Sequence, residues 1–181
     1  MAVDVRGGGP GTRDTDALDP STLVEEYHGI VLSGGSVFGL AAADGVTAWL
    51  SEHGIGLPMG PKALPVVPAA ILFDLTNGGD KEWGDTNPYV ALGRAACENT
   101  GKTFALGNVG AGAGATAGSL KGGLGSASLV DDAGYQVGAI VASNPMGEVL
   151  IPGTDVFWAW AFEHGDEFGG KVPKAKPESP L

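Results

Sequence analysis

The stretch NVGAGAGATAGSLKGGLGSAS, residues 108–128, has glycine at positions 110, 112, 114, 118, 122, 123 and 125. Glycine loses more conformational freedom on folding than any other residue, so this density indicates a backbone that approaches another group closely or takes positive φ angles. One cation, Lys121, stands within this glycine segment. Backbone N–H groups beside a cation can hold an anion or a developing oxyanion. A flexible linker is the alternative, but Leu120 and Leu124 favour an ordered path into a strand.

A strand, a turn and a helix are predicted ahead of the glycine segment. The apolar residues 29–32 are typical of a short buried strand, which ends in the SGGS turn, residues 33–36. Phe38, Ala42 and Val46 then recur at helical spacing. The N-terminus of such a helix can bind an anion or a carbonyl oxygen. We discount a dinucleotide site, because the turn lacks the G-x-G-x-x-G pattern.

The composition is that of one globular domain. Of the 181 residues, 43% are hydrophobic and 17% are charged, so the chain can bury a real core. The formal net charge of −11 makes nucleic acid a poor partner. The same acidic balance suits small amine-bearing substrates, because it attracts cations toward the protein.

The sequence carries no pattern that predicts export or membrane insertion. The opening residues, MAVDVRGGGP, lack the apolar core of a secretory signal, and no apolar run reaches bilayer-spanning length. Cys97 is the one cysteine, so no internal disulfide can form and a reducing compartment is favoured. We therefore expect a cytoplasmic protein with no membrane partner.

The remaining elements are predicted from local patterns. Strands are expected over 2–5, 64–73 and 148–151, helices over 21–26, 88–99 and 157–162, and a hairpin that pairs 123–130 with 135–143 through the turn 131–134. Pro65 and Pro68 reduce the run 64–73 to an edge strand or an irregular path. Pro88 fits the first position of a helix, with Thr86 or Asn87 as its cap.

The chain lacks a complete set of catalytic side chains. His28, His53 and His164 do not have the spacing of a metal site, and we interpret each as a structural or surface residue. No G-x-S-x-G elbow is present, and no serine has an assignable base. Backbone donors, Lys121 and the amide of Asn144 remain, and these can hold a carbonyl group but cannot attack it. We therefore expect the nucleophile on another polypeptide, and no metal or cofactor.

Four motifs, in order, resemble those of the P1-type peptidases of the aminopeptidase and amidase group. They are RGGGPGTRDTD (6–16), LSGGSVFGLAAADGV (32–46), VGAGAGATAGSLKGGLGSAS (109–128) and VASNPMG (141–147). The group includes D-Ala-esterase/L-aminopeptidase enzymes, β-peptidyl aminopeptidases and nylon-oligomer (6-aminohexanoate) hydrolases, which look like N-terminal-nucleophile hydrolases. The resemblance implies an α+β fold, an αββα sandwich in which two packed sheets lie between helices.

The resemblance also implies a second subunit. In these enzymes the precursor cleaves itself, and a Thr or Ser becomes the first residue of a small β subunit. Residues 1–168 are then the α-subunit part of a single domain, and αβ pairs assemble into a tetramer or a larger oligomer. Residues 169–181, GGKVPKAKPESPL, have little to bury, which predicts a disordered tail. By the resemblance, this tail leads to the processing site.

The resemblance assigns roles to particular residues. Asn144 matches the asparagine whose side chain points at the oxyanion. Lys121 matches a lysine near the nucleophile, where a cation helps to keep the α-amine of the N-terminal Thr or Ser unprotonated, so that this amine can act as the base. The substrate-binding residues that it implies are Gly34, Gly35, Ser36, Phe38 and Gly112.

This chain departs from the family pattern at two places. Phe38 stands where many relatives have a tyrosine, so the hydrogen bond that this phenol gives is absent. Relatives also carry an additional strand and loop ahead of the AVDVRGG position, residues 2–8. The first departure bears on substrate preference, because a phenolic donor would contact the substrate or the intermediate.

Three functions are compatible with these observations. The leading prediction is a hydrolase, active only with its β subunit, of amine-ended peptides or of ω-amino acid oligomers such as nylon fragments. An acyltransferase of ornithine-acetyltransferase type looks similar in fold and self-processing, but it passes the acyl group to an amino acid instead of water. A glycine-rich structural or binding subunit would show neither self-processing nor sensitivity to Asn144→Ala.

Overall fold

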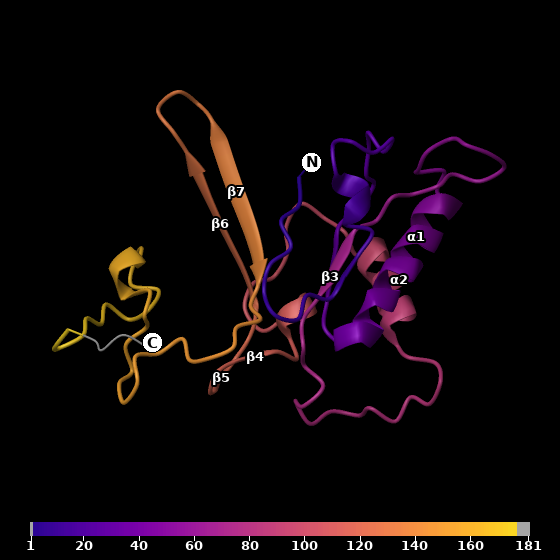
Figure 1. The fold of residues 1–181 in the computed structure, drawn as a ribbon. Helices are drawn as coiled ribbons and strands as arrows, with labels where there is room; N and C mark the ends of the chain where they lie inside the picture. The colour runs from indigo at the N-terminus through magenta and orange to yellow at the C-terminus, as the bar shows by residue number, and fades with distance from the viewer. Residues whose placement is uncertain (1, 177–181) are drawn as a thin grey trace.

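The computed structural model describes residues 2–176 and is mixed α+β, as predicted. Its largest sheet has three short strands: β1 (Thr12–Arg13), β2 (Val31–Ser33) and β3 (Ala69–Ile71). The spatial order is β1-β3-β2, in which β2 and β3 run parallel and β1 runs antiparallel to β3 (Figure 1). The αββα sandwich, with a second sheet packed on this one, stays a prediction.

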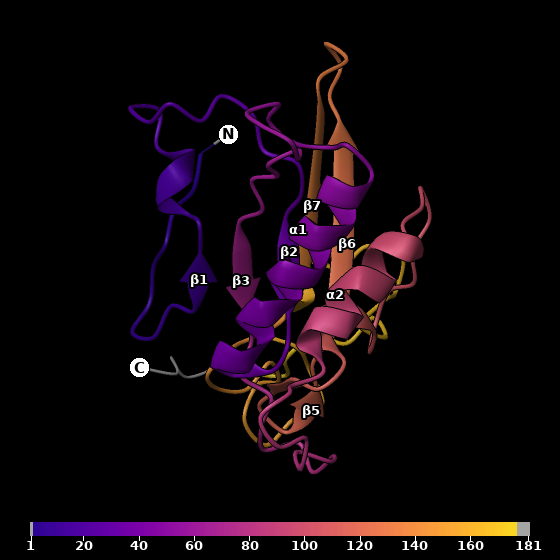
Figure 2. The ribbon, with the colours of Figure 1, turned by 90° about the vertical axis from the view of Figure 1, so that its right-hand side faces the viewer.

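Two helices, α1 (Ala42–Glu52) and α2 (Tyr89–Glu98), lie together on one side of this sheet. Figures 1 and 2 show them opposite the side from which the β6–β7 hairpin projects. The core lies between α1 and the sheet, and its buried members are Val31, Ala42, Ala43, Val46, Leu50, Val67 and Ala69. Small residues let the helices approach closely, because a Cβ atom at Gly93 would overlap the carbonyl oxygen of Ala42.

Both long helices were predicted, and their local signals explain where they begin. A 3₁₀ turn, η2 (Ser36–Ala41), connects the SGGS turn to α1. Pro88 directly precedes α2, and Asn87 Oδ1 binds the first N–H of the helix by accepting a hydrogen bond from the Tyr89 backbone N–H at 3.1 Å. Among residues 2–176, no helix is both long and apolar enough to cross a membrane.

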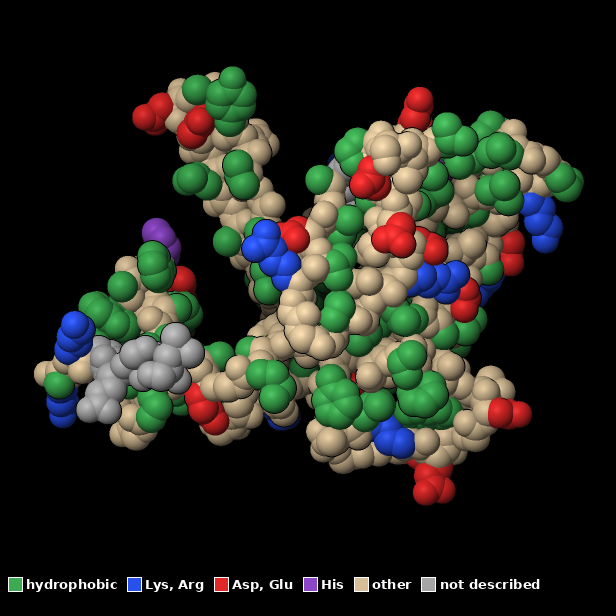
Figure 3. All heavy atoms as spheres, viewed as in Figure 1, with side chains coloured by type: hydrophobic (Ala, Val, Ile, Leu, Met, Phe, Trp, Pro, Cys, Tyr) green, Lys and Arg blue, Asp and Glu red, His purple; other side chains and the backbone are tan. Residues whose placement is uncertain are grey.

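The predicted hairpin is confirmed, with β6 (Leu124–Val130) paired to β7 (Gln136–Ala142) in an antiparallel ladder. Asp131 Oδ1 fixes its turn by accepting the backbone N–H groups of Ala133 and Tyr135. The hairpin stands away from the rest of the described chain (Figure 3), and nearly all its residues are exposed. Its apolar side chains therefore face solvent on both sides, because the adjacent residues Leu129 and Val130, which project to opposite faces, are 69% and 61% exposed.

The glycine segment follows an ordered path. It contains the 3₁₀ turn η3 (Gly110–Gly112) and a small hairpin of β4 (Thr116–Ala117) and β5 (Leu120–Lys121). The Asn108 side-chain amide holds the segment together by donating to the carbonyl oxygens of Ala113 and Gly122, both at 3.0 Å.

Several predicted elements are shorter than expected or absent from the described residues. Residues 2–5 form no strand, and 148–151 contribute only the bridge between Leu150 and Phe157. The 64–73 run keeps three strand residues, β3, because its prolines cannot donate to a ladder. The predicted edge position is wrong, since β3 lies between β1 and β2. In 157–162 only the 3₁₀ turn η4 (Trp160–Phe162) forms.

The helix predicted over 21–26 is also wrong, for a local reason. Asp19 Oδ1 accepts hydrogen bonds from both the backbone N–H and the hydroxyl of Ser21. This side-chain bonding competes with helix formation, and the nearest helical turn is the 3₁₀ turn η1 (Asp16–Leu18). In the predicted disordered tail, 169–176 contain no helix or strand, and 177–181 lie outside the described residues, so disorder stays a prediction.

Candidate functional site

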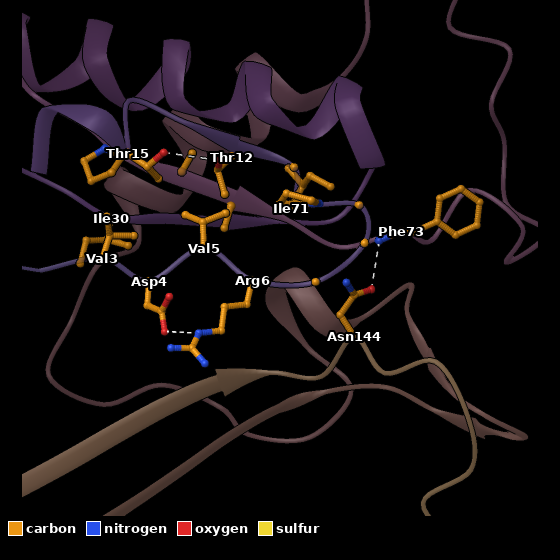
Figure 4. A pocket seen from close by; sticks show the side chains of 18 of the residues that line it. Val3, Asp4, Val5, Arg6, Thr12, Thr15, Ile30, Ile71, Phe73 and Asn144 are labelled. Atoms are coloured by element: carbon orange, nitrogen blue, oxygen red, sulfur yellow. Dashed lines mark hydrogen bonds and ion pairs between the residues drawn. The ribbon is translucent and has the colours of Figure 1, made fainter. Parts of the chain in front are cut away.

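A cleft of about 710 Å³ lies beside the three-stranded sheet. Figure 4 shows its wall formed by the N-terminal segment, the sheet and the loop that follows β7, which carries Asn144. The side chains of Val5 and Ile71 make the wall apolar near the sheet. The side chains of Arg6 and Asp4 point away from the sheet and form an ion pair, with Arg6 Nε 2.6 Å from Asp4 Oδ2.

Asn144 is fixed at the edge of this cleft by a backbone donor. The Phe73 N–H donates to Asn144 Oδ1 at 3.2 Å (Figure 4). A backbone N–H can only donate, so the partner must be the amide oxygen and the orientation of the amide is defined. No other hydrogen bond joins the Asn144 side chain to residues 2–176, so its Nδ2 donors are free to bind another group.

Lys121 is on the same face of the β4–β5 hairpin as one residue of the cleft wall. Lys121 is the register partner of Thr116, and Thr116 lines the cleft. Directly opposed residues of an antiparallel pair project to the same face. The turn of this hairpin is held by Ser119, whose hydroxyl donates to Glu148 Oε2 at 3.0 Å. Among residues 2–176, no carboxylate forms an ion pair with Lys121.

The SGGS turn has an unusual backbone. Gly35 and Ser36 both have positive φ, at 84° and 53°, and Ser36 is a left-handed residue with a side chain. Such a conformation costs free energy and persists only where the surroundings impose it. Here the Ser36 N–H donates to the Leu72 carbonyl oxygen at 2.9 Å, and the Gly35 N–H donates to Asp74 Oδ1 at 2.7 Å.

Phe38 belongs to an aromatic cluster rather than to the wall of the cleft. Its ring lies edge-on to the Trp83 ring, with 5.8 Å between the ring centroids. The Trp83 ring also lies edge-on to the Tyr89 ring, with 6.1 Å between their centroids. Phe38 is 44% exposed, so one side of this cluster is accessible. Burial, and then the negative charge of Asp74, raise the pKa of the Tyr89 phenol.

The predicted site residues therefore fall into three groups. Asn144 lines the cleft. Lys121 does not line it, but Lys121 projects to the same face of the β4–β5 hairpin as Thr116, which does. Gly34, Gly35, Ser36 and Phe38 do not line the cleft. Gly112 is buried in close backbone packing, because a Cβ atom there would overlap Gly123.

The sequence profile of Peptidase family S58 matches residues 1–165. This chain belongs to that family. It is similar to an uncharacterized aminopeptidase of Mycobacterium tuberculosis, with 45% identity over 175 residues, which are 97% of this chain and 49% of the relative. An uncharacterized aminopeptidase of Mycobacterium leprae is 43% identical over 180 residues, 95% of this chain and 48% of the relative. The chain thus spans about half the length of the curated relatives that it matches.

Two histidines of the S58 chain have structural partners, as the sequence indicated. His28 Nδ1 accepts a hydrogen bond from the Val66 N–H at 3.1 Å. The His53 ring stacks on Trp49 with 3.8 Å between ring centroids. Within residues 2–176, no three His, Cys, Asp or Glu side chains group as a metal site would require.

Cys97 packs against the core, and burial raises the pKa of its thiol. A raised pKa keeps the thiol protonated and unreactive. The sequence interpretation of Cys97 as a small packing residue therefore agrees with its position.

Sequence reasoning missed the two residues that connect these parts of the S58 chain. The apolar pattern predicts a strand that ends at Phe73, and it assigns no role to Asp74. One signal was available, because Asp74 is the first charged residue after the apolar run 64–73. A carboxylate at the end of a buried strand can accept hydrogen bonds from neighbouring turns, which is the role it has here.

Proposed function

We propose that this chain is the larger part of an amide or peptide hydrolase. The nucleophile is the N-terminal Thr or Ser of a second polypeptide, which forms when a precursor cleaves itself. The substrates are peptides with a free amine end, or ω-amino acid oligomers such as 6-aminohexanoate oligomers. Membership of Peptidase family S58 and the aminopeptidase names of the relatives support a hydrolase of this general kind.

The observation that carries the proposal is the orientation of Asn144. Its oxygen is occupied by the Phe73 N–H, so its NH₂ group is the part that can act on a ligand in the cleft. A fixed donor that faces a cleft is suited to hold a carbonyl oxygen as it becomes an oxyanion. Because the donor is oriented before the substrate arrives, no free energy is spent to turn it during the reaction.

Lys121 has a separate role in this proposal. Lys121 is an exposed cation with no ion-pair partner among residues 2–176. It projects to the same face of the β4–β5 hairpin as Thr116, which lines the cleft. A cation near an amine disfavours the protonated amine and lowers its pKa. The α-amine of an N-terminal Thr or Ser would then be neutral near pH 7 and could accept the proton of its own hydroxyl.

The second polypeptide is supported by two observations. The β6–β7 hairpin exposes apolar side chains on both faces, which a chain in water normally covers. The curated relatives are about twice as long as the matched region. We therefore infer that the remaining part of the precursor packs on this hairpin and buries its apolar side chains.

The proposed reaction balances without a metal or cofactor. The nucleophilic hydroxyl gives its proton to the neighbouring α-amine and attacks the amide carbonyl, and Asn144 Nδ2 donates to the oxyanion. The ammonium then returns the proton to the leaving amine, and the C–N bond breaks to give an ester. Water attacks this ester by the same route and releases the acid.

The test uses the full-length precursor, purified after processing, with L-aminoacyl p-nitroanilides and a 6-aminohexanoate dimer as probes. Intact mass after a rapid acid quench should show an acyl group on the smaller polypeptide only. Turnover without such an adduct under burst conditions, or an adduct on residues of this chain, would contradict the proposal. Transfer of the acyl group to an added amino acid instead of water would indicate an acyltransferase.

A further inference from the structure

The segment that follows β3, residues 74–77, binds both glycine-rich motifs. Asp74 Oδ1 accepts the Gly35 N–H at 2.7 Å, and so holds the SGGS turn. Asn77 Nδ2 donates to the Gly114 carbonyl oxygen at 3.2 Å, and so holds the glycine segment. Two side chains of one short loop thus connect segments that are far apart in the sequence.

The Asp74 carboxylate is enclosed closely by glycines. A Cβ atom at Gly34 or at Gly114 would overlap Asp74 Oδ2, so any larger residue at either position would displace the carboxylate. A Cβ atom at Gly35 would overlap the Tyr89 ring. The glycines at these three positions therefore leave room for one carboxylate and one phenol ring.

Asp74 also follows directly after the residue that orients Asn144. The Phe73 N–H donates to Asn144 Oδ1, and Asp74 accepts from Gly35. Two adjacent residues of one chain segment therefore bind the proposed oxyanion donor and the SGGS turn. A shift of either residue would change the distance between these two parts.

We propose that Asp74 is a positioning residue, which holds the SGGS turn at a fixed place relative to the Asn144 amide. This inference rests on the proposed function, because the positioned groups are those that would bind the substrate. Asp74 acts through the hydrogen bond that its Oδ1 accepts, and not through its charge. Displacement of a reacting group by about 1 Å can cost about a hundredfold in rate.

Three variants of the full-length precursor distinguish whether Asp74 acts through the hydrogen bond that its Oδ1 accepts or through its negative charge. Asp74→Asn removes the charge and keeps an oxygen that can accept the Gly35 N–H, so kcat and KM should stay near wild type. Asp74→Glu keeps the charge but adds a methylene between enclosing glycines, and Asp74→Ala removes the acceptor. Both should lower kcat about a hundredfold. Asp85→Asn, an exposed acid on the same loop, is the control for loss of charge.

The pattern across variants decides the outcome. Wild-type kcat in Asp74→Ala would overturn the inference, as would an active Asp74→Glu beside an inactive Asp74→Asn, because that pattern assigns the role to charge. If circular dichroism shows that Asp74→Ala does not fold, the Asn and Glu variants make the same distinction. A wild-type precursor with no hydrolase activity would contradict the proposed function instead. Hydrogen exchange of the Gly35 amide, slow in wild type and Asp74→Asn but fast in Asp74→Ala, tests the hydrogen bond independently of activity.

Discussion

Phe73 donates its backbone N–H to the side-chain oxygen of Asn144 at 3.2 Å, across 71 residues of sequence. This bond joins the end of the β3 segment to the loop after β7. It also decides which end of the Asn144 amide can serve a ligand, because the oxygen is already occupied. The proposed chemistry depends on this one orientation.

The Asn144 amide is predicted to donate to the oxyanion, so Asn144→Ala and Asn144→Asp should lower kcat by about two to three orders of magnitude. The aspartate can still accept the Phe73 N–H, but an ionised carboxylate cannot donate. Initial rates with an L-aminoacyl p-nitroanilide measure the loss, and far-UV circular dichroism controls for folding. Near-normal kcat in the folded Asp variant would exclude donation by Asn144.

Lys121→Ala should move the acidic limb of the pH–rate profile toward higher pH. Loss of a nearby cation raises the pKa of the proposed α-amine base, so less of it is neutral at a given pH. The profile of kcat/KM between about pH 5 and 9 measures this shift. Lys102→Ala, at an exposed loop position, is the matched control. An unchanged profile in Lys121→Ala would restrict this lysine to a structural role.

The raised pKa of Tyr89 predicts an alkaline loss of stability. Burial and the charge of Asp74 both disfavour the phenolate in the folded state, so the unfolded state loses its proton first, near pH 10. Stability should be unaffected by this group below about pH 10 and should fall as the pH rises above that value. Urea midpoints at pH 8 and pH 11 should therefore differ less in Tyr89→Phe than in wild type.

Gly93→Ala should destabilise the protein although alanine favours helices. The gain in helix propensity is about 1 kcal/mol. The added methyl group would overlap the Ala42 carbonyl oxygen of α1, and overpacking typically costs about 1–3 kcal/mol. Because backbone cannot move aside as a side chain can, we expect a lower thermal midpoint. Gly101→Ala, at an exposed loop position where an added Cβ atom would meet nothing closer than 3.6 Å, should leave the midpoint unchanged or raise it.

The elements that could be predicted from sequence have local signals. The hairpin turn is fixed by Asp131, and the start of α2 by Asn87, each through bonds to residues two to four positions away. The sequence also singled out Asn144, Lys121 and the SGGS turn, because their motifs resemble those of a known group.

The connections between these parts could not be predicted, because they join distant residues. Gly35 and Asp74 are 39 residues apart, and Phe73 and Asn144 are 71 apart. Pro65 and Pro68 indicate that the strand in 64–73 is short or irregular, but they do not indicate that β3 lies between β1 and β2. Apolar composition predicts burial, but only pairing partners decide where a strand begins and ends.

Denaturing intact-mass analysis of the natively purified protein, with N-terminal sequencing of every polypeptide, tests most directly whether the nucleophile lies on a second chain. We expect two polypeptides, of which the smaller begins with Thr or Ser and copurifies with this chain. Its amount should follow the hydrolase activity through purification. An active protein that consists of one unprocessed polypeptide would contradict the claim that the nucleophile is a newly formed N-terminus on a second chain.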